Sequence, residues 1–275
     1  MYVHGYEARE QRRLQDQADT LSELLHHDTS YPAGARVLEV GCGVGAQTVT
    51  LARNSPRARF TSIDVSPHSI AAAQETLART GATNVEFRRA DLFDLAFSDA
   101  TFDHAFLCFV LEHLRRPLSA LTAIRRVVRP GGTITVIEGD HGSAYFHPDD
   151  ARAREAIDCL IRLQARAGGN ALIGRQLYPL LLAAGLRRVR VSPRMVYVDA
   201  SRPALVDGFT RRTFTAMIAG VRQDAVAARF MTPRAFDAGI RALERTTRAD
   251  GAFCYTFFKA VARTTRARSA VTSDS

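Results

Sequence analysis

Long apolar runs are missing from this sequence. No stretch of its 275 residues approaches the roughly 18–20 consecutive apolar residues that a membrane-spanning helix needs. The first residues, Met1 to Glu7, also lack the apolar core of a secretory signal peptide. We therefore expect a cytoplasmic protein that has no membrane partner.

Cysteine and lysine are scarce. The four cysteines form no C-x-x-C pair, which disfavours a structural zinc site and predicts reduced thiols. Only one of the 37 basic residues is a lysine, Lys259, and such a preference for arginine is typical of GC-rich coding. Hydrophobic residues make up 46% of the chain and charged residues 24%, a mixture that excludes a wholly disordered protein.

The charge is unevenly distributed. Residues 1–140 hold 15 basic and 17 acidic side chains, whereas residues 141–275 hold 22 and 11. A basic half can face nucleic acid or acidic lipid. These arginines, however, are scattered along amphipathic helices with no basic stripe interleaved with aromatics. We therefore expect a solvated basic surface and no nucleic-acid partner.

Apolar strands alternate with helices through the first half of the chain. Strands are expected at 37–40, 60–65, 85–88, 102–109 and 133–138, and helices at 46–54, 67–80 and 118–128. Ser66 and Pro67 are typical of a helix start, and Gly81 of a helix end. This alternation predicts an α/β fold, with a mostly parallel sheet that has helices on both faces.

Amphipathic segments flank this pattern. A helix is expected at 8–27 and further helices around 151–167, 174–184, 203–220 and 233–246, with strands at 187–192 and 253–261. We divide the chain into an N-terminal helical lid at 1–30, a main domain at 31–262 and a flexible tail at 263–275. The main domain would carry a C-terminal helical insertion, a cap around 145–180 and 203–246.

A glycine-rich turn, Gly41-Cys42-Gly43-Val44-Gly45, directly follows the first strand. Such a turn lets the backbone approach a ligand closely and directs a helix N-terminus toward it. Asp64 ends the second strand, where a carboxylate can accept two ribose hydroxyls. Asp91 follows the third strand, where it can accept from an adenine amino group. Together these features predict a cofactor site.

These segments, with Val127-Val128-Arg129-Pro130-Gly131-Gly132, resemble the successive motifs of class I S-adenosylmethionine-dependent methyltransferases. The resemblance is dense over residues 36–140. It implies a Rossmann-like sheet of seven strands, the last one antiparallel at 253–261. It also implies S-adenosylmethionine as the cofactor.

The resemblance assigns the residues around the methionine part of that cofactor. This part would lie against the turn, at Gly41, Cys42, Gly43 and Gly45. Its carboxylate would meet Gln47 and Thr48. Its amino group would meet the backbone of Cys108 and Phe109.

The same resemblance assigns the nucleoside part. Asp64 would bind the ribose and Val65 would pack on the adenine. Asp91 would bind the adenine amino group, and Leu92 would cover the ring. Glu39 stands where many members have aspartate, which preserves the charge.

The end of the fourth strand indicates the class of methyl acceptor. It has no Asn/Asp-Pro-Pro-aromatic motif, Cys108 is not preceded by proline, and no acidic cluster is typical of a magnesium site, so we expect no metal. Val110-Leu111-Glu112-His113-Leu114 instead resembles small-molecule O-, N- and C-methyltransferases. His113 is a candidate general base, and a purely structural histidine is equally compatible with the pattern.

Further candidates lie on the loop 138–148 and near the N-terminus. Because ligands bind at the carboxyl ends of parallel strands, His141 and Tyr145 of this loop are predicted to face the substrate. Tyr6 would close over it from the lid. Aromatic and methionine side chains of the cap would form its core or an apolar substrate pocket, Phe209, Phe214, Met217, Phe230 and Met231.

Three further segments resemble actinobacterial natural-product enzymes, indole C3-methyltransferases among them. They are the Tyr-Val-His-Gly-Tyr start, Gly43-Val44-Gly45-Ala46-Gln47-Thr48 and Glu138-Gly139-Asp140-His141-Gly142-Ser143. The predicted function is methyl transfer to a small aromatic molecule, with C3 of an N-acyl tryptamine indole as the candidate acceptor. O- or N-methylation of a small aromatic metabolite is the alternative, and a non-catalytic binding protein of the same fold is a more distant one. The sequence does not indicate the oligomeric state.

Overall fold

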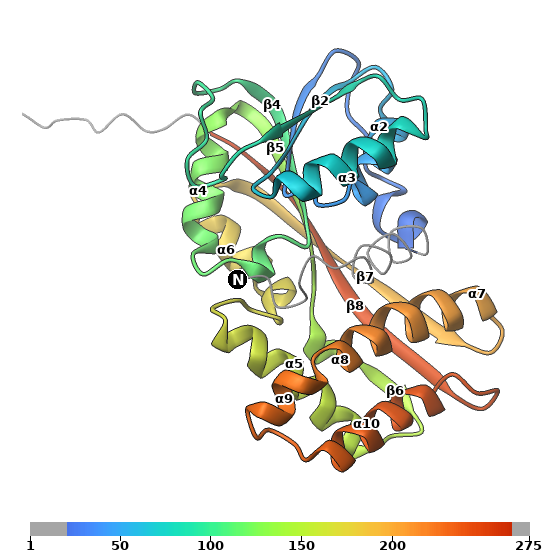
Figure 1. Cartoon of the computed structure of the whole chain (residues 1–275). Coiled ribbons are helices and arrows are strands. Elements are labelled where there is room, and N and C mark those ends of the chain that lie inside the picture. Colours follow the sequence, from blue (N-terminus) through green and yellow to red (C-terminus); the bar gives the residue numbers. More distant parts are fainter. Residues whose placement is uncertain (1–20, 266–275) are drawn as a thin grey trace, which may run out of the picture.

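Five parallel strands form one side of the sheet, from its β3 edge inward, in the computed structural model, which describes residues 21–265 (Figure 1). They run in the order β3-β2-β1-β4-β5, with bounds β1 (Arg36–Val40), β2 (Arg59–Asp64), β3 (Val85–Arg89), β4 (Phe102–Cys108) and β5 (Val128–Gly139). The switch in strand order between β1 and β4 opens a crevice beyond their carboxyl ends, where ligands of such sheets bind.

Helices cover both faces of this sheet, as predicted. They are α2 (Ala46–Asn54), α3 (Pro67–Ala78) and α4 (Pro117–Val127). Leu51 of α2 belongs to the core on one face, and Leu121 of α4 to the core on the other. The Ser66 hydroxyl caps α3 by accepting from the Ser69 amide, with Pro67 in the first turn.

Two long antiparallel strands complete the sheet. β8 (Ala252–Arg263) pairs with β5 on one side and with β7 (Arg187–Asp199) on the other, so the last strand is antiparallel as predicted. β7 is longer than expected because it continues through Pro193, which an edge strand tolerates. A short strand that the sequence did not predict, β6 (Tyr145–His147), pairs with the start of β8 and makes the sheet eight-stranded.

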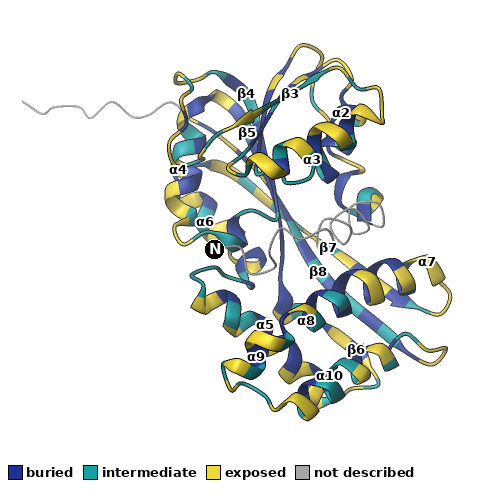
Figure 2. Ribbon diagram, in the orientation of Figure 1, coloured by how far each residue is buried: buried dark blue, intermediate teal, exposed yellow. Residues whose placement is uncertain are grey.

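The remaining helices gather mainly at the outer end of the β7–β8 pair (Figure 1). α5 (Ala151–Arg166), η3 (Ile173–Gln176) and α6 (Leu177–Ala183) precede β7. Between β7 and β8 come α7 (Pro203–Leu205), η4 (Val206–Thr215), α8 (Ala216–Gly220), α9 (Arg222–Ala227) and α10 (Pro233–Arg245). Figure 2 shows exposed residues of these helices on the outer surface of the molecule. Within residues 21–265, no helix is long and apolar enough to cross a membrane.

The helix η4 is a π-helix rather than an α-helix. Its backbone hydrogen bonds join residues that are five positions apart in the sequence, so side chains five positions apart lie on the same side of the helix. Phe209 and Phe214 therefore both face β8, where their ring centroids lie 5.9 and 5.4 Å from that of Tyr255. The sequence predicted a helix here but gave no signal of this winding.

Part of the sequence-based division falls outside the described residues. Of the predicted N-terminal helix, residues 21–26 are described and are helical, and Leu21 and Leu25 pack into the core. Residues 1–20, which include most of the predicted lid, and residues 266–275 of the predicted tail lie outside the described chain.

The aromatic core of the cap generates a prediction about stability. Phe214 is fully buried, and its ring lies 4.7 Å from that of Phe253. Replacing Phe214 with alanine should lower the free energy of unfolding by about 3–5 kcal/mol, because the cavity is enclosed by rings that cannot all relax. Urea denaturation measures the loss. Tyr197→Ala is the matched control on β7, where the side chain is half-exposed; an equal loss there would contradict this packing.

Candidate functional site

The glycine turn between β1 and α2 has the geometry of a ligand cradle. Gly45 adopts a left-handed φ of 81° immediately before α2, and a Cβ there would lie 3.0 Å from the Cα of Ala73. Any side chain at this position would therefore strain the α2–α3 packing. A Cβ added to Gly43, in contrast, would meet no described atom within 4 Å. The turn is thus tightly packed against α3 at Gly45 and open at Gly43.

Asp64 lies beside this turn, at the end of β2. Its carboxylate accepts from the Gly43 amide at 3.0 Å and from the Ser66 amide at 2.9 Å, so its orientation is fixed by the backbone. The next residue, Val65, leaves 57% of its surface exposed, which is unusual for an apolar side chain beside a packed strand. A flat apolar ligand group would pack on Val65 here, and a ligand hydroxyl would donate to the Asp64 carboxylate.

Asp91 follows β3, the neighbouring strand of the sheet. Its side chain is exposed, and Oδ1 accepts from the Phe93 amide at 2.8 Å. Leu92 beside it is half-buried. The turn, Asp64 and Asp91 thus lie in order along the carboxyl edge of β1, β2 and β3, the order in which an elongated nucleoside ligand would use them.

The first turn of α2 carries the two predicted carboxylate contacts. Thr48 is fully buried and donates its hydroxyl to Glu39 at 2.8 Å, so this hydroxyl is already used within the core. Gln47 is half-buried, and its Oε1 lies 2.6 Å from Nε2 of His26. Gln47 therefore remains the side chain available to a ligand at this helix start.

Beyond β4 the backbone turns sharply. Phe109 has a left-handed φ of 57° and donates its amide to the Ile137 carbonyl. Glu138, fully buried at the end of β5, accepts from the Val110 and Leu111 amides and so holds this turn. Burial, reinforced by the nearby Glu112, raises the pKa of Glu138 well above its usual range.

Two cysteines lie in the walls of the site. Burial raises the pKa of Cys108 and of Cys42 well above the ordinary value of a thiol. Neither thiolate is therefore populated at neutral pH, which disfavours either cysteine as a nucleophile.

His113 lies at the end of η1 (Leu111–His113), the short helix that follows β4. Its Nε2 lies 3.6 Å from Oε1 of Glu112, and its side chain is 20% exposed. Gln164 of α5 donates to both the backbone carbonyl and the carboxylate of Glu112, which ties this segment to the cap. His113 is thus accessible and backed by a carboxylate, the arrangement that supports a general base.

His141 lies in η2 (His141–Ser143) and contacts a tyrosine that the sequence analysis did not single out. Its Nδ1 lies 2.7 Å from the hydroxyl of Tyr255, and both side chains are buried. Phe253, Tyr255 and Phe257 alternate along β8 and share one face of the strand. That alternation was the available signal for Tyr255.

Tyr145 does not join this pair. It is opposite Cys254 in the β6–β8 register, so its side chain lies on the face away from Tyr255, and it is 64% exposed. Phe146, its neighbour, points to the cap core instead and stacks on Phe253. Tyr6, the other predicted tyrosine, lies outside the described residues. Among residues 21–265 no group of three or more His, Cys, Asp or Glu side chains is arranged to hold a metal ion.

Glu39 beneath the turn generates a prediction about pH. Burial raises the pKa of Glu39 to about 7. The folded protein therefore holds a proton between pH 4.5 and 7 that the unfolded chain has lost, and stability falls as the pH rises through this window. Glu39→Gln removes the titration, so relative to wild type it should gain up to about 3 kcal/mol between pH 4.5 and 8.

Denaturation of both proteins at several pH values measures this difference. Glu86→Gln, at an exposed carboxyl on β3, is the control and should show a much smaller change. A constant stability difference between Glu39→Gln and wild type across the range would show that Glu39 titrates normally.

Known proteins resemble part of this chain in sequence. Residues 38–136 match a family model described as a methyltransferase domain. The chain is 36% identical to the O-methyltransferase rstn1 of Aspergillus nomiae over 121 residues, which cover 44% of this chain and 53% of that protein. The chain spans about half the length of this and other curated relatives that it matches.

Solved structures share the fold over most of the chain. The [4+2]-cyclase SpnF is 22% identical with a TM-score of 0.52, covering 91% of this chain and 80% of its own. Phosphoethanolamine N-methyltransferase 2 of Haemonchus contortus, solved with S-adenosylhomocysteine, is 15% identical with a TM-score of 0.55, covering 90% and 53%. Residues 38–136 thus match the methyltransferase domain, and the chain as a whole has the Rossmann-like fold of these proteins.

Proposed function

We propose that the chain is an S-adenosylmethionine-dependent methyltransferase that acts on a small molecule. The observation that carries this proposal is the alignment of the open glycine turn, the backbone-fixed Asp64 and the exposed Asp91 along one edge of the sheet. The exposed Val65 offers an apolar surface for an adenine. Bound S-adenosylmethionine would supply an electrophilic methyl group on its sulfonium.

The cap supports an apolar and aromatic methyl acceptor. The row Phe253, Tyr255 and Phe257 lies under η4, and the ring of Phe257 lies 5.6 Å from that of Phe109 at the end of β4. Aromatic side chains therefore continue from the cap to the edge where the cofactor would lie. Phe253, Tyr255 and Phe257 are packed core positions, so the half-buried Phe109 is the ring of this row that a flat aromatic ligand would contact.

We propose C3 of an N-acyl tryptamine indole as the acceptor. The C3–CH₃ bond forms as the S–CH₃ bond breaks, which leaves S-adenosylhomocysteine and a positive charge on the indole. The side-chain amide nitrogen then closes onto C2 and loses its proton, giving a neutral pyrroloindoline. His113 and His141 are the candidate proton acceptors. No metal or covalent cysteine is needed, because C3 is itself the nucleophile.

O- or N-methylation of a small aromatic metabolite is the second candidate. The similarity to a fungal O-methyltransferase favours it. The same histidines would then remove a proton from the acceptor hydroxyl or amine as the methyl group is transferred.

Asp64 provides the test of cofactor binding. Asp64→Ala should weaken the binding of S-adenosylhomocysteine by about 1–3 kcal/mol, because the ribose hydroxyls lose a charged acceptor. Calorimetry measures this loss. Asp94→Ala, at an exposed carboxylate nearby, should bind as wild type does. Unchanged affinity in Asp64→Ala would remove this residue from the site.

Incubation with an N-acyl tryptamine and isotope-labelled S-adenosylmethionine tests the acceptor. We expect a C3-methylated, ring-closed product by mass spectrometry and NMR. A parallel panel of phenols and aromatic amines is the comparison. Methyl transfer only to oxygen or nitrogen would establish the second candidate. Cofactor binding without transfer to any acceptor in the panel would contradict both and favour a binding protein.

A further inference from the structure

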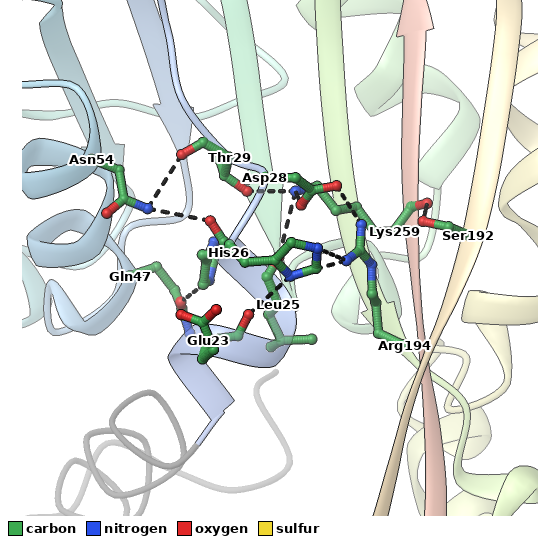
Figure 3. Close-up of polar contacts among 11 residues, drawn as sticks. Glu23, Leu25, His26, Asp28, Thr29, Gln47, Asn54, Ser192, Arg194 and Lys259 are labelled. Carbon is green, nitrogen blue, oxygen red and sulfur yellow. Dashed lines mark hydrogen bonds and ion pairs between the residues drawn. The ribbon is translucent and has the colours of Figure 1, made fainter.

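The single lysine of the chain fixes the turn that follows the N-terminal helix. Lys259 lies on β8, between Ile137 of β5 and Ser192 of β7, and its side chain is 3% exposed. Its ammonium donates to the Leu25 carbonyl at 3.4 Å, to Asp28 at 2.6 Å and to the Thr29 hydroxyl (Figure 3). Three donors thus meet three acceptors, so this buried charge is satisfied only while residues 25–29 stay in place.

A second strand holds the same turn. Arg194 of β7 forms an ion pair with the other carboxylate oxygen of Asp28 (Figure 3). It also contacts the ring of His27. Asn54 at the end of α2 donates to the His26 and Thr29 carbonyls from the opposite side. The backbone at His26 is therefore fixed by contacts from β7, β8 and α2.

The ring of His26 points from this fixed backbone to the start of α2. It is 1% exposed, packs at 5.8 Å from the ring of Phe106, and places Nε2 2.6 Å from Oε1 of Gln47 (Figure 3). Burial lowers the pKa of His26 to about 4, against the raising effect of the bond to Gln47. The imidazole is therefore neutral at pH 7, and its one N–H donates to Gln47 from Nε2.

A buried histidine at position 26 lowers the stability of the fold relative to an apolar side chain at the same position. Nδ1 of His26 is then bare, buried and without a hydrogen-bond partner among residues 21–265. Leu21 and Leu25 fill the neighbouring core positions with apolar groups. A role in holding Gln47 accounts for a histidine here, because accepting at Oε1 leaves the Gln47 amide NH₂ group to donate to a ligand at the start of α2.

We propose that His26 is a positioning residue that acts through Gln47 on the amino-acid end of the cofactor. The proposal rests on the proposed function, in which Gln47 meets the carboxylate of S-adenosylmethionine. His26 holds Oε1 of Gln47, so the amide presents its NH₂ group to that carboxylate. Lys259 and Arg194 act one step further back, by holding the turn that directly follows His26.

Two ligands that differ only at this end separate positioning from a merely structural role. S-adenosylhomocysteine carries the amino-acid carboxylate, whereas 5′-methylthioadenosine has the same nucleoside and sulfur but lacks it. His26→Leu fills the space without a donor. His26→Gln restores an N–H donor at similar reach. Calorimetry of both ligands with wild type and both variants, and their melting temperatures, are the measurements.

We expect His26→Leu to bind S-adenosylhomocysteine about tenfold more weakly, the loss of one oriented hydrogen bond, and 5′-methylthioadenosine unchanged. His26→Gln should recover most of the affinity. Gln47→Ala should reduce the affinity for S-adenosylhomocysteine by a similar factor. Adding His26→Leu to Gln47→Ala should change the affinity little, because His26 acts through Gln47.

Equal weakening of both ligands by His26→Leu, or no weakening of either, would overturn the positioning role. A lower melting temperature with full affinity for S-adenosylhomocysteine would show that His26 only supports the fold. If wild type binds neither ligand, the proposed function itself fails, and this outcome is distinguishable because it appears without any substitution.

Discussion

The antiparallel pairing of β7 with β8 is the constraint on which the two halves of the molecule depend. The C-terminal half of β8 fills the sheet between β5 and β7, and its N-terminal half carries the aromatic row beneath the cap. One continuous strand therefore contributes its aromatic row to the core that joins the cap to one face of the main sheet, and Ala260 and Ala262 to the core on the other face. The cap cannot tilt away from the main sheet without bending this pair or breaking its ladder of backbone hydrogen bonds.

Buried titratable groups concentrate at the carboxyl edge of the sheet, which is typical of functional sites. Burial raises the pKa values of Glu39 and Glu138 and lowers that of His26, so each neutral form is favoured. The consequences for stability have opposite signs. Glu39 costs stability as the pH rises from 4.5 to 7, whereas His26 contributes stability as the pH rises from 4 to 6.5, because only the unfolded chain binds the proton there.

Short-range features of the sequence determined the main sheet and its helices. Ser66-Pro67, the glycines after β1 and the alternation of apolar strands with helices act over a few residues, and the structure follows them. The carboxyl-edge placement of Asp64 and Asp91 was equally predictable, since each directly follows a strand. Such features are local because caps, turns and left-handed glycines depend on neighbouring backbone.

Only the tertiary structure decided which distant side chains meet. The contacts of Lys259 with Asp28, of His26 with Gln47 and of His141 with Tyr255 join segments between 21 and 231 residues apart. The sequence likewise favoured Tyr145, but the β6–β8 register turns it to the other face. Local pattern specifies which face of an element is apolar. It does not specify the tertiary packing that brings together polar side chains from elements far apart in the sequence.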